Sequence, residues 1–422
     1  MRRFNYQMRP FSFNSGDIGR LQTQMLFPVV AGDSIELNFS AIYRLASLRR
    51  NLTLDAVIDT FAFFVPHRHI YGSDWTDFIR DGVDEAVTFT NGPAASGQGY
   101  FATRRESTEL WPLWVVAGYN RIWNRYFRAP TDTASERSDT AIETSGRGQE
   151  FGVLCGRLKK PWTTGIEGEP VAADRQVSST SVVDLVEFSE IQARYKTEAL
   201  RSWFATRYTD ILAETYGGSA NPDADERPTL CYRVTKTLSD YDVDGTDAAS
   251  LGTFSGKSAS VVTFNMPSKF FTEHGALWIM CLVRFPMVHG RERHYLVGKP
   301  NPTYEEISGD PEVIGNKGPY STDISEWFNT GATDDLGAVP YGQWYRYQPD
   351  FVHLKYQNLT GFPFLQNLPV NATQARYHRD GEYDNTFNAA PQLGQWNSAG
   401  RFDMMVKRVT PTAVSSIMAG AN

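Results

Sequence analysis

The chain has 422 residues, of which 13% are aromatic, together with 34 Gly and 22 Pro. This composition is typical of a compact protein with many loops and argues against a helical bundle. The net charge of −7 argues against a general affinity for nucleic acid, and the three widely spaced cysteines indicate a reducing compartment, with neither a disulfide framework nor a zinc site.

Membrane insertion is not expected. The longest apolar stretches, residues 111–119 and 276–283, are shorter than the roughly 20 residues that span a bilayer. The basic N-terminus runs into polar residues, with no apolar signal region behind it. We therefore expect a soluble protein that is made in the cytoplasm.

The N-terminal residues carry a local positive charge. Residues 1–20 sum to +3, because four arginines outweigh Asp17. Arginines and rings alternate there, with Arg2, Arg3 and Arg9 among Phe4, Tyr6 and Phe11. Rings that stack on bases and guanidinium groups that meet phosphates suit single-stranded nucleic acid. On the sequence alone, a disordered tail with solubilising charge is favoured; a basic DNA-binding arm over residues 1–24, with Arg2, Arg3 and Arg9 as its contacts, is the alternative.

Strand patterns recur along the chain and lie far apart. Residues 34–39 (SIELNF) alternate polar with apolar, and residues 56–65 (AVIDTFAFFV) form a β-branched and aromatic run that Pro66 stops. Residues 274–285 (HGALWIMCLVRF) and 401–409 (RFDMMVKRV) repeat the theme. Any sheet that these segments share must have long connections.

Helical patterns and long loops lie between the strands. Ser73 is placed to cap a helix over residues 74–80, and a second helix is predicted over residues 189–216, before Gly217-Gly218. Loop-forming residues dominate the ranges 91–98, 131–148 and 217–228. These patterns together predict a small β core with very long insertions. Insertions of this length need partners that cover them, so we expect contacts between subunits.

The stretch DYDVDGTDAASLGTFSGKS, residues 240–258, resembles two known sites. Asp240, Asp242 and Asp244 match the start of a calcium loop, but Leu251 stands where a bidentate Glu is needed. The same Leu251 stands where a phosphate-binding loop needs its first glycine, before the terminal Gly-Lys-Ser. We therefore predict a structured loop; a cation held by the three aspartates is the alternative.

No catalytic or cofactor constellation is visible. His67 and His69 would share one face of an extended segment, yet no ligand nearby completes a metal site, which favours a structural or interface role. No G-x-S-x-G nucleophile motif is present. The aromatic stretch GQWYRY, residues 342–347, is predicted to pack in the core or at an interface, with sugar contact as the alternative.

Several short motifs occur together in one order along the chain. They include IGRL at residues 18–21, PVVAGDS at 28–34, FFVPHRHIYG at 63–72 and GQWYRY at 342–347. In these motifs, and in others that extend to near Met418, the chain resembles the major capsid proteins of the φX-type single-stranded DNA bacteriophages, the Microviridae. The resemblance implies one capsid domain over residues 1–422, a mainly β, eight-stranded antiparallel jelly roll with very long, helix-containing insertions. Residues 25–70, 274–290 and 400–410 are then expected to be among the core strands, residues 71–260 and 291–399 to be mostly long insertions, and the arm to lie on the inner surface of the shell.

The resemblance also implies partners. The chain is expected to form pentamers and a closed virion shell of about 60 copies around single-stranded DNA, with spike and scaffolding proteins and host lipopolysaccharide as further partners. A shell of about 60 chains of charge −7 carries about −420, so a small basic internal protein is expected to condense the genome. Four tryptophans are candidate interface anchors, with core burial as the alternative: Trp111, Trp114, Trp123 and Trp327. A carbohydrate-binding β-sandwich and a glycoside hydrolase are the competing functional hypotheses.

Overall fold

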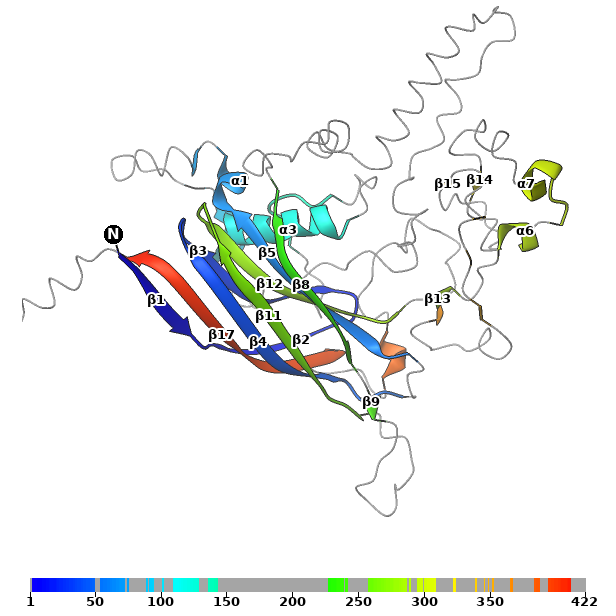
Figure 1. The fold of residues 1–422 in the computed structure, drawn as a ribbon, viewed down its shortest axis with the longest axis horizontal. Helices are drawn as coiled ribbons and strands as arrows, with labels where there is room; N and C mark the ends of the chain where they lie inside the picture. The colour runs from blue at the N-terminus through cyan, green and yellow to red at the C-terminus, as the bar shows by residue number, and fades with distance from the viewer. Residues whose placement is uncertain are drawn as a thin grey trace, which may run out of the picture.

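The computed structural model describes the β core and parts of its connections. The described residues are 2–49, 54–72, 74–75, 89, 91–94, 101, 109–128, 136–142, 227–238, 240–241, 257–286, 288–289, 294–298, 300–308, 322–323, 338–339, 345, 348, 351–352, 365–366, 383–387 and 394–410. Figure 1 shows the long strands gathered into one body, while the short strands β13 (Val288–His289), β14 (Thr322–Asp323) and β15 (Ala338–Val339) lie apart from it.

The first sheet, called sheet 1, joins the two ends of the described chain. It contains β1 (Arg2–Met8), β2 (Phe11–Gly16), β4 (Ser34–Leu45), β11 (Ser260–Phe270) and β17 (Trp396–Thr410). The strand order is β1-β17-β4-β11, and β2 also pairs with β17, so β1 and β2 form one edge strand interrupted at Arg9-Pro10. Along β4 buried and exposed side chains alternate strictly, as a strand with one covered face requires.

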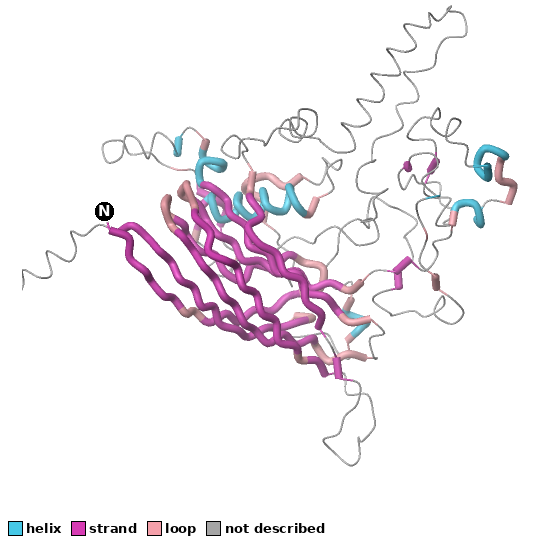
Figure 2. Tube along the Cα trace, in the orientation of Figure 1, coloured by secondary structure: helices cyan, strands magenta, loops and turns pink. Residues whose placement is uncertain are grey.

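The second sheet, called sheet 2, lies against sheet 1. It contains β3 (Leu21–Val29), β5 (Ala56–Pro66), β8 (Thr229–Leu238) and β12 (Gly275–Arg284), in the order β3-β12-β5-β8. The central strands β5 and β12 are buried along almost their whole length, so they read as continuous apolar runs. Figure 2 shows the strands of both sheets running side by side, with α3 beside them.

The strand order identifies the topology. With β1 and β2 counted as one, the two sheets contain eight strands in chain order, with orders 1-8-3-6 and 2-7-4-5. The first strand pairs with the eighth, the second with the seventh, the third with the sixth and the fourth with the fifth. This is the pairing of one long hairpin that is rolled into two sheets. All these pairs are antiparallel. The predicted eight-stranded jelly roll is confirmed.

Two apolar layers hold the sheets and the main helix together. Between the sheets, Phe39 of β4 stacks on Phe402 of β17 with ring centroids 4.2 Å apart, and Trp396 is fully buried. On the other side of sheet 2, α3 (Leu113–Tyr126) packs through a second cluster that includes Trp278. Gly118 of α3 lies so close to Trp278 that an added Cβ would be 3.1 Å from its ring. The helix therefore covers the face of sheet 2 that points away from sheet 1.

The remaining described elements are short. They are α1 (His67–Tyr71), β6 (Asn91–Ala94), β7 (Leu110–Pro112), β9 (Asp240–Tyr241), β10 (Lys257–Ser258), β13 (Val288–His289), α6 (Tyr295–Gly298), α7 (Tyr304–Ser308), β14 (Thr322–Asp323), β15 (Ala338–Val339), β16 (Leu365–Gln366) and the 3-10 helix η8 (Asp384–Thr386). Among the described helices, none is long and apolar enough to span a membrane.

The four predicted strands are confirmed as β4, β5, β12 and β17, although β4 continues to Leu45 and β17 begins already at Trp396. Core strands also occur outside the ranges that were expected to contain them. Residues 2–24, within the expected arm, supply β1, β2 and the start of β3, since β1 pairs with β17 along its length. Two further core strands, β8 and the start of β11, fall at the end of the range assigned to insertions. The helix predicted over residues 189–216 lies outside the described residues, as does most of the one over 74–80, of which Asp74 and Trp75 are helical.

Candidate nucleic-acid interface

The outward side of sheet 1, called the open face, carries an exposed apolar row. The ladder register places Phe13 of β2 opposite Ala399 of β17, Ala399 opposite Ile42 of β4, and Ile42 opposite Val261 of β11. Phe13 is 80% exposed and Val261 is 70% exposed. Directly paired residues of antiparallel strands point to the same side, so these four side chains form one stripe across the sheet.

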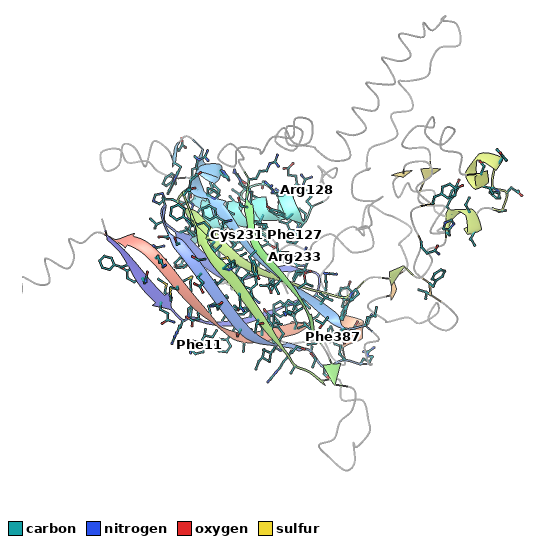
Figure 3. All side chains as sticks on the ribbon, in the orientation of Figure 1. Phe11, Phe127, Arg128, Cys231, Arg233 and Phe387 are labelled. Atoms are coloured by element: carbon teal, nitrogen blue, oxygen red, sulfur yellow. The ribbon has the colours of Figure 1, made fainter. Side chains whose placement is uncertain are left out.

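Next to this stripe an arginine covers an exposed ring. Phe11 of β2 pairs with Arg401 of β17, and the guanidinium carbon of Arg401 lies 5.5 Å from the centroid of the Phe11 ring. Phe11 is 70% exposed. Figure 3 labels Phe11 on the opposite side of the strands from Arg128, which follows α3. The ring and the guanidinium group together offer a flat apolar surface beside a fixed positive charge.

The open face is positively charged although the chain is acidic. Its described charged side chains are Arg9, Arg44, Arg401 and Lys407 against Glu36 and Asp403, which sums to +2. Asp403 accepts a hydrogen bond from Gln7 at 2.9 Å and pairs with Arg9 at 3.5 Å. Both side chains of that ion pair are about half exposed, so the pair adds little to stability and leaves Arg9 accessible.

The predicted DNA-binding arginines are therefore placed on a sheet. Arg2 and Arg3 lie in β1 opposite Thr410 and Val409, and their side chains lie outside the described residues. Arg9 lies at the break between β1 and β2, on the open face. The face also includes Arg401 and Phe13, which sequence reasoning missed because nothing local links residues 13 and 401.

The candidate interface tryptophans lie in different places. Trp111 and Trp123 are 1% and 0% exposed within a single chain, where they pack against sheet 2 and within α3. Trp114 is half-buried, with its ring 5.2 Å from that of His67. Trp327 lies outside the described residues. Burial gives Trp111 and Trp123 a role in the core, and a contact of any of the four with a neighbouring subunit stays a prediction.

His67 and His69 do not share a face as the sequence predicts. The strand β5 ends at Pro66, and both residues lie in α1, where positions two apart point in directions about 200° apart. The ring of His67 packs against Trp75 at 4.8 Å, and burial together with the nearby charge of His274 lowers the pKa of His67 to about 4. Within the described residues, no group of three His, Cys, Asp or Glu side chains is arranged to hold a metal ion.

The two ends of the 240–258 stretch pair with each other. Asp240 pairs with Ser258 and Tyr241 with Lys257, as β9 and β10. The Ser258 hydroxyl accepts a hydrogen bond from the amide of Leu45 at 3.2 Å, so it completes the end of β4. These contacts give Ser258 a structural role, while Asp242 and Asp244 lie outside the described residues, as does the side chain of Asp240.

Buried ion pairs tie the strands of sheet 2 together. Asp59 of β5 is 1% exposed, and its carboxylate accepts hydrogen bonds from Arg233 of β8 at 2.9 Å and Arg284 of β12 at 2.8 Å, and from the Thr235 hydroxyl. Burial by itself raises the pKa of Asp59, but the bonds from Thr235 and the two arginines outweigh it and lower that pKa. Asp33 is likewise buried against Arg408. Sequence reasoning missed these pairs because their partners lie more than 170 residues apart.

Known proteins are similar to this chain along almost its whole length. A model of the family described as "Capsid protein (F protein)" matches residues 1–167 and 133–418. The chain is 38% identical over 416 residues to the capsid protein F of Enterobacteria phage phiK, 37% over 412 residues to that of Escherichia phage G4, and 36% over 417 residues to that of Escherichia phage alpha3. Each match covers 96% of this chain and 95% of the relative.

The chain belongs to the capsid protein F family of the Microviridae. It is therefore a structural protein of the virion rather than an enzyme, which decides against the glycoside hydrolase hypothesis. The jelly roll found here agrees with that membership. The principal function of a capsid protein F is to form the viral shell. Carbohydrate binding is therefore also set aside as the principal function of this chain.

Proposed function

We propose that this capsid protein F assembles through pentamers into a closed icosahedral shell of about 60 copies around a circular single-stranded DNA genome. In this proposal the open face of sheet 1 lies against the DNA. The observation that carries it is the pairing of exposed rings with positive charge on one uncovered face of an acidic chain.

The chemistry of the open face suits single-stranded DNA. Each exposed aromatic ring can stack on a base, which contributes about 1–3 kcal/mol per base without selecting its identity. Arg9 and Arg401 lie within the same face and supply charge for phosphates. Because the charges of Glu36 and Asp403 offset part of this, the contact is weak for one subunit, and repetition over the shell makes it effective.

The remaining partners follow from charge and from the family. About 60 chains of −7 sum to about −420, so the shell does not neutralise the genome, and a small basic internal protein completes condensation. Spike and scaffolding proteins assist assembly and infection, and the outer surface attaches to host lipopolysaccharide. If soluble lipopolysaccharide sugars neither bind to intact particles nor reduce infectivity, attachment through this chain is wrong.

Point substitutions test the DNA contact. Deleting residues 1–10 would remove a whole strand of sheet 1, because β1 pairs with β17 throughout. We would instead replace Phe11 and Phe13 by Ser, and separately Arg401 by Gln, and complement a phage that lacks its own capsid gene. DNA per particle is measured from absorbance, and DNA order from cryo-electron microscopy. Matched controls are Tyr304→Ser, an exposed ring on α7, and Lys236→Gln, an exposed charge on β8.

The expected result is full particles that hold their DNA less firmly, with weaker ordered density along the open face, in the test variants alone. If instead the variants yield soluble pentamers and no particles, the open face is a contact between subunits and its role in DNA binding is wrong. Unchanged DNA density would contradict the proposal equally.

A further inference from the structure

A pocket of about 710 Å³ lies beside the C-terminal half of α3. Since α3 covers the side of sheet 2 that faces away from sheet 1, this pocket and the open face lie on opposite sides of the sandwich. Its described lining contains five arginines: Arg121, Arg125, Arg128, Arg137 and Arg227. Two carboxylates, Glu136 and Asp139, also line it, so the charge of the described lining is +3.

The two carboxylates differ in how closely they bind arginine. Asp139 forms a two-pronged pair with Arg121, through bonds of 3.0 and 2.8 Å. Glu136 approaches Arg128 only to 3.9 Å, and its side chain is more than half exposed while that of Arg128 is largely buried. A buried guanidinium group is less screened by solvent than an exposed one, so the positive charge in the pocket acts over a longer distance than it would on the surface.

Side-chain hydrogen bonds fix the walls of the pocket. Asn124 of α3 donates to the carbonyl of Arg137 at 2.8 Å and accepts from its amide at 2.9 Å. One turn earlier, Asn120 donates to the carbonyls of Ser138 and Ala141. These bonds hold the backbone of residues 137–141 against the helix, so the segment that carries Arg137 is in place before any ligand arrives.

The third segment of the lining, Arg227 and Pro228, is attached to α3 by Tyr126. Its hydroxyl donates to the carbonyl of Pro228 at 2.9 Å and accepts from the amide of Leu230 at 3.1 Å. Arg227 is thereby brought next to α3, since its neighbour Pro228 binds Tyr126 across 102 residues of sequence. Three separate segments converge on one positively charged pocket.

We propose that this pocket binds phosphate groups. Guanidinium groups match the planar, two-oxygen geometry of phosphate, and the pocket is larger than a single phosphate group, so two linked phosphates fit its charge and size. The described lining contains no aromatic residue, and Trp123 beneath it is fully buried, with the guanidinium carbon of Arg137 5.4 Å from its ring centroid. The site therefore recognises phosphate and not a base. Free pyrophosphate and the phosphodiesters of DNA share this chemistry.

The test uses the unassembled full-length protein, so it is independent of the proposed shell. Pyrophosphate is titrated calorimetrically at low salt into the wild type, Arg227→Gln and the Arg137→Gln, Arg227→Gln double variant. The anchoring bonds near Arg227 use backbone atoms of Pro228 and Leu230, so this substitution leaves them in place. Thermal unfolding confirms that each variant folds. Lys236→Gln, which removes the same charge from an exposed position of β8 outside the pocket and the open face, is the matched control.

We expect the dissociation constant to rise about tenfold or more in the double variant, to rise less in Arg227→Gln, and to stay unchanged in Lys236→Gln. A dT10 oligonucleotide that displaces pyrophosphate from the wild type identifies DNA as the source of the phosphate. Failure of dT10 to compete identifies a small phosphorylated ligand. If the wild type binds no pyrophosphate, or if Lys236→Gln weakens binding as much as Arg227→Gln does, the phosphate site is wrong.

Discussion

Replacement of Asp59 by Asn tests how sheet 2 is held together. Asp59 is buried and joins β5 to β8 and β12 through Arg233, Thr235 and Arg284. The substitution removes the negative charge and replaces one carboxylate oxygen by an amide NH2 group. This group is a hydrogen-bond donor, so it repels the guanidinium group that it faces. Removing one partner of a fully buried ion pair costs about 3–5 kcal/mol. Because the Arg233 and Arg284 side chains are 47% and 34% exposed, water compensates part of this, and we expect a loss of about 2–3 kcal/mol.

Urea unfolding followed by tryptophan fluorescence measures this loss in the unassembled protein. Asp403→Asn makes the same chemical change at an aspartate whose partners are exposed, and we expect it to cost about 0.5 kcal/mol or less. Since the folded state lowers the pKa of Asp59, its contribution is present above its unfolded pKa and is lost as pH falls toward the folded pKa. The difference between wild type and Asp59→Asn should therefore shrink in acid. Equal losses in Asp59→Asn and Asp403→Asn would refute the reasoning.

Two further changes probe the same core. A Cβ at Gly275 would lie 2.4 Å from the carbonyl oxygen of Val65 on the neighbouring strand, so Gly275→Ala should lower the free energy of unfolding by about 1–3 kcal/mol, and an unchanged urea midpoint would contradict this. Burial lowers the pKa of His67 to about 4, so between about pH 6.5 and pH 4 the unfolded chain binds a proton that the folded chain does not. The free energy of unfolding therefore decreases as the pH is lowered through that window. His67→Gln should flatten this dependence in stability curves measured against pH, whereas parallel curves would show that His67 does not carry it.

Strand positions were predictable where alternation or an apolar run was strong. The ten-residue run over 56–65 and the alternation of residues 34–39 each identified a core strand, because the side-chain pattern of a strand is a local property. The jelly-roll order came from resemblance and not from periodicity. Which strands pair depends on contacts between residues hundreds of positions apart, such as Phe39 with Phe402.

The errors have physical causes too. Residues 2–8 resemble a free arm because their arginines and rings suit solvent and nucleic acid, yet backbone pairing with β17 makes them a strand. Helix α3 was not predicted because it is buried around much of its circumference, and its apolar residues then show no single stripe. The arginine pocket combines residues 121–128, 136–139 and 227, a combination that only folding creates.

The pairing of β1 with β17 has a consequence for biosynthesis. At a ribosomal rate of about 5–20 residues per second, roughly 20–80 seconds pass between the emergence of Met8 and that of Thr410. Throughout that interval the N-terminal strand has no partner along its edge, and such an edge invites pairing with another nascent chain. A capsid protein made in many copies on neighbouring ribosomes therefore depends on holding this edge apart until its own last strand arrives.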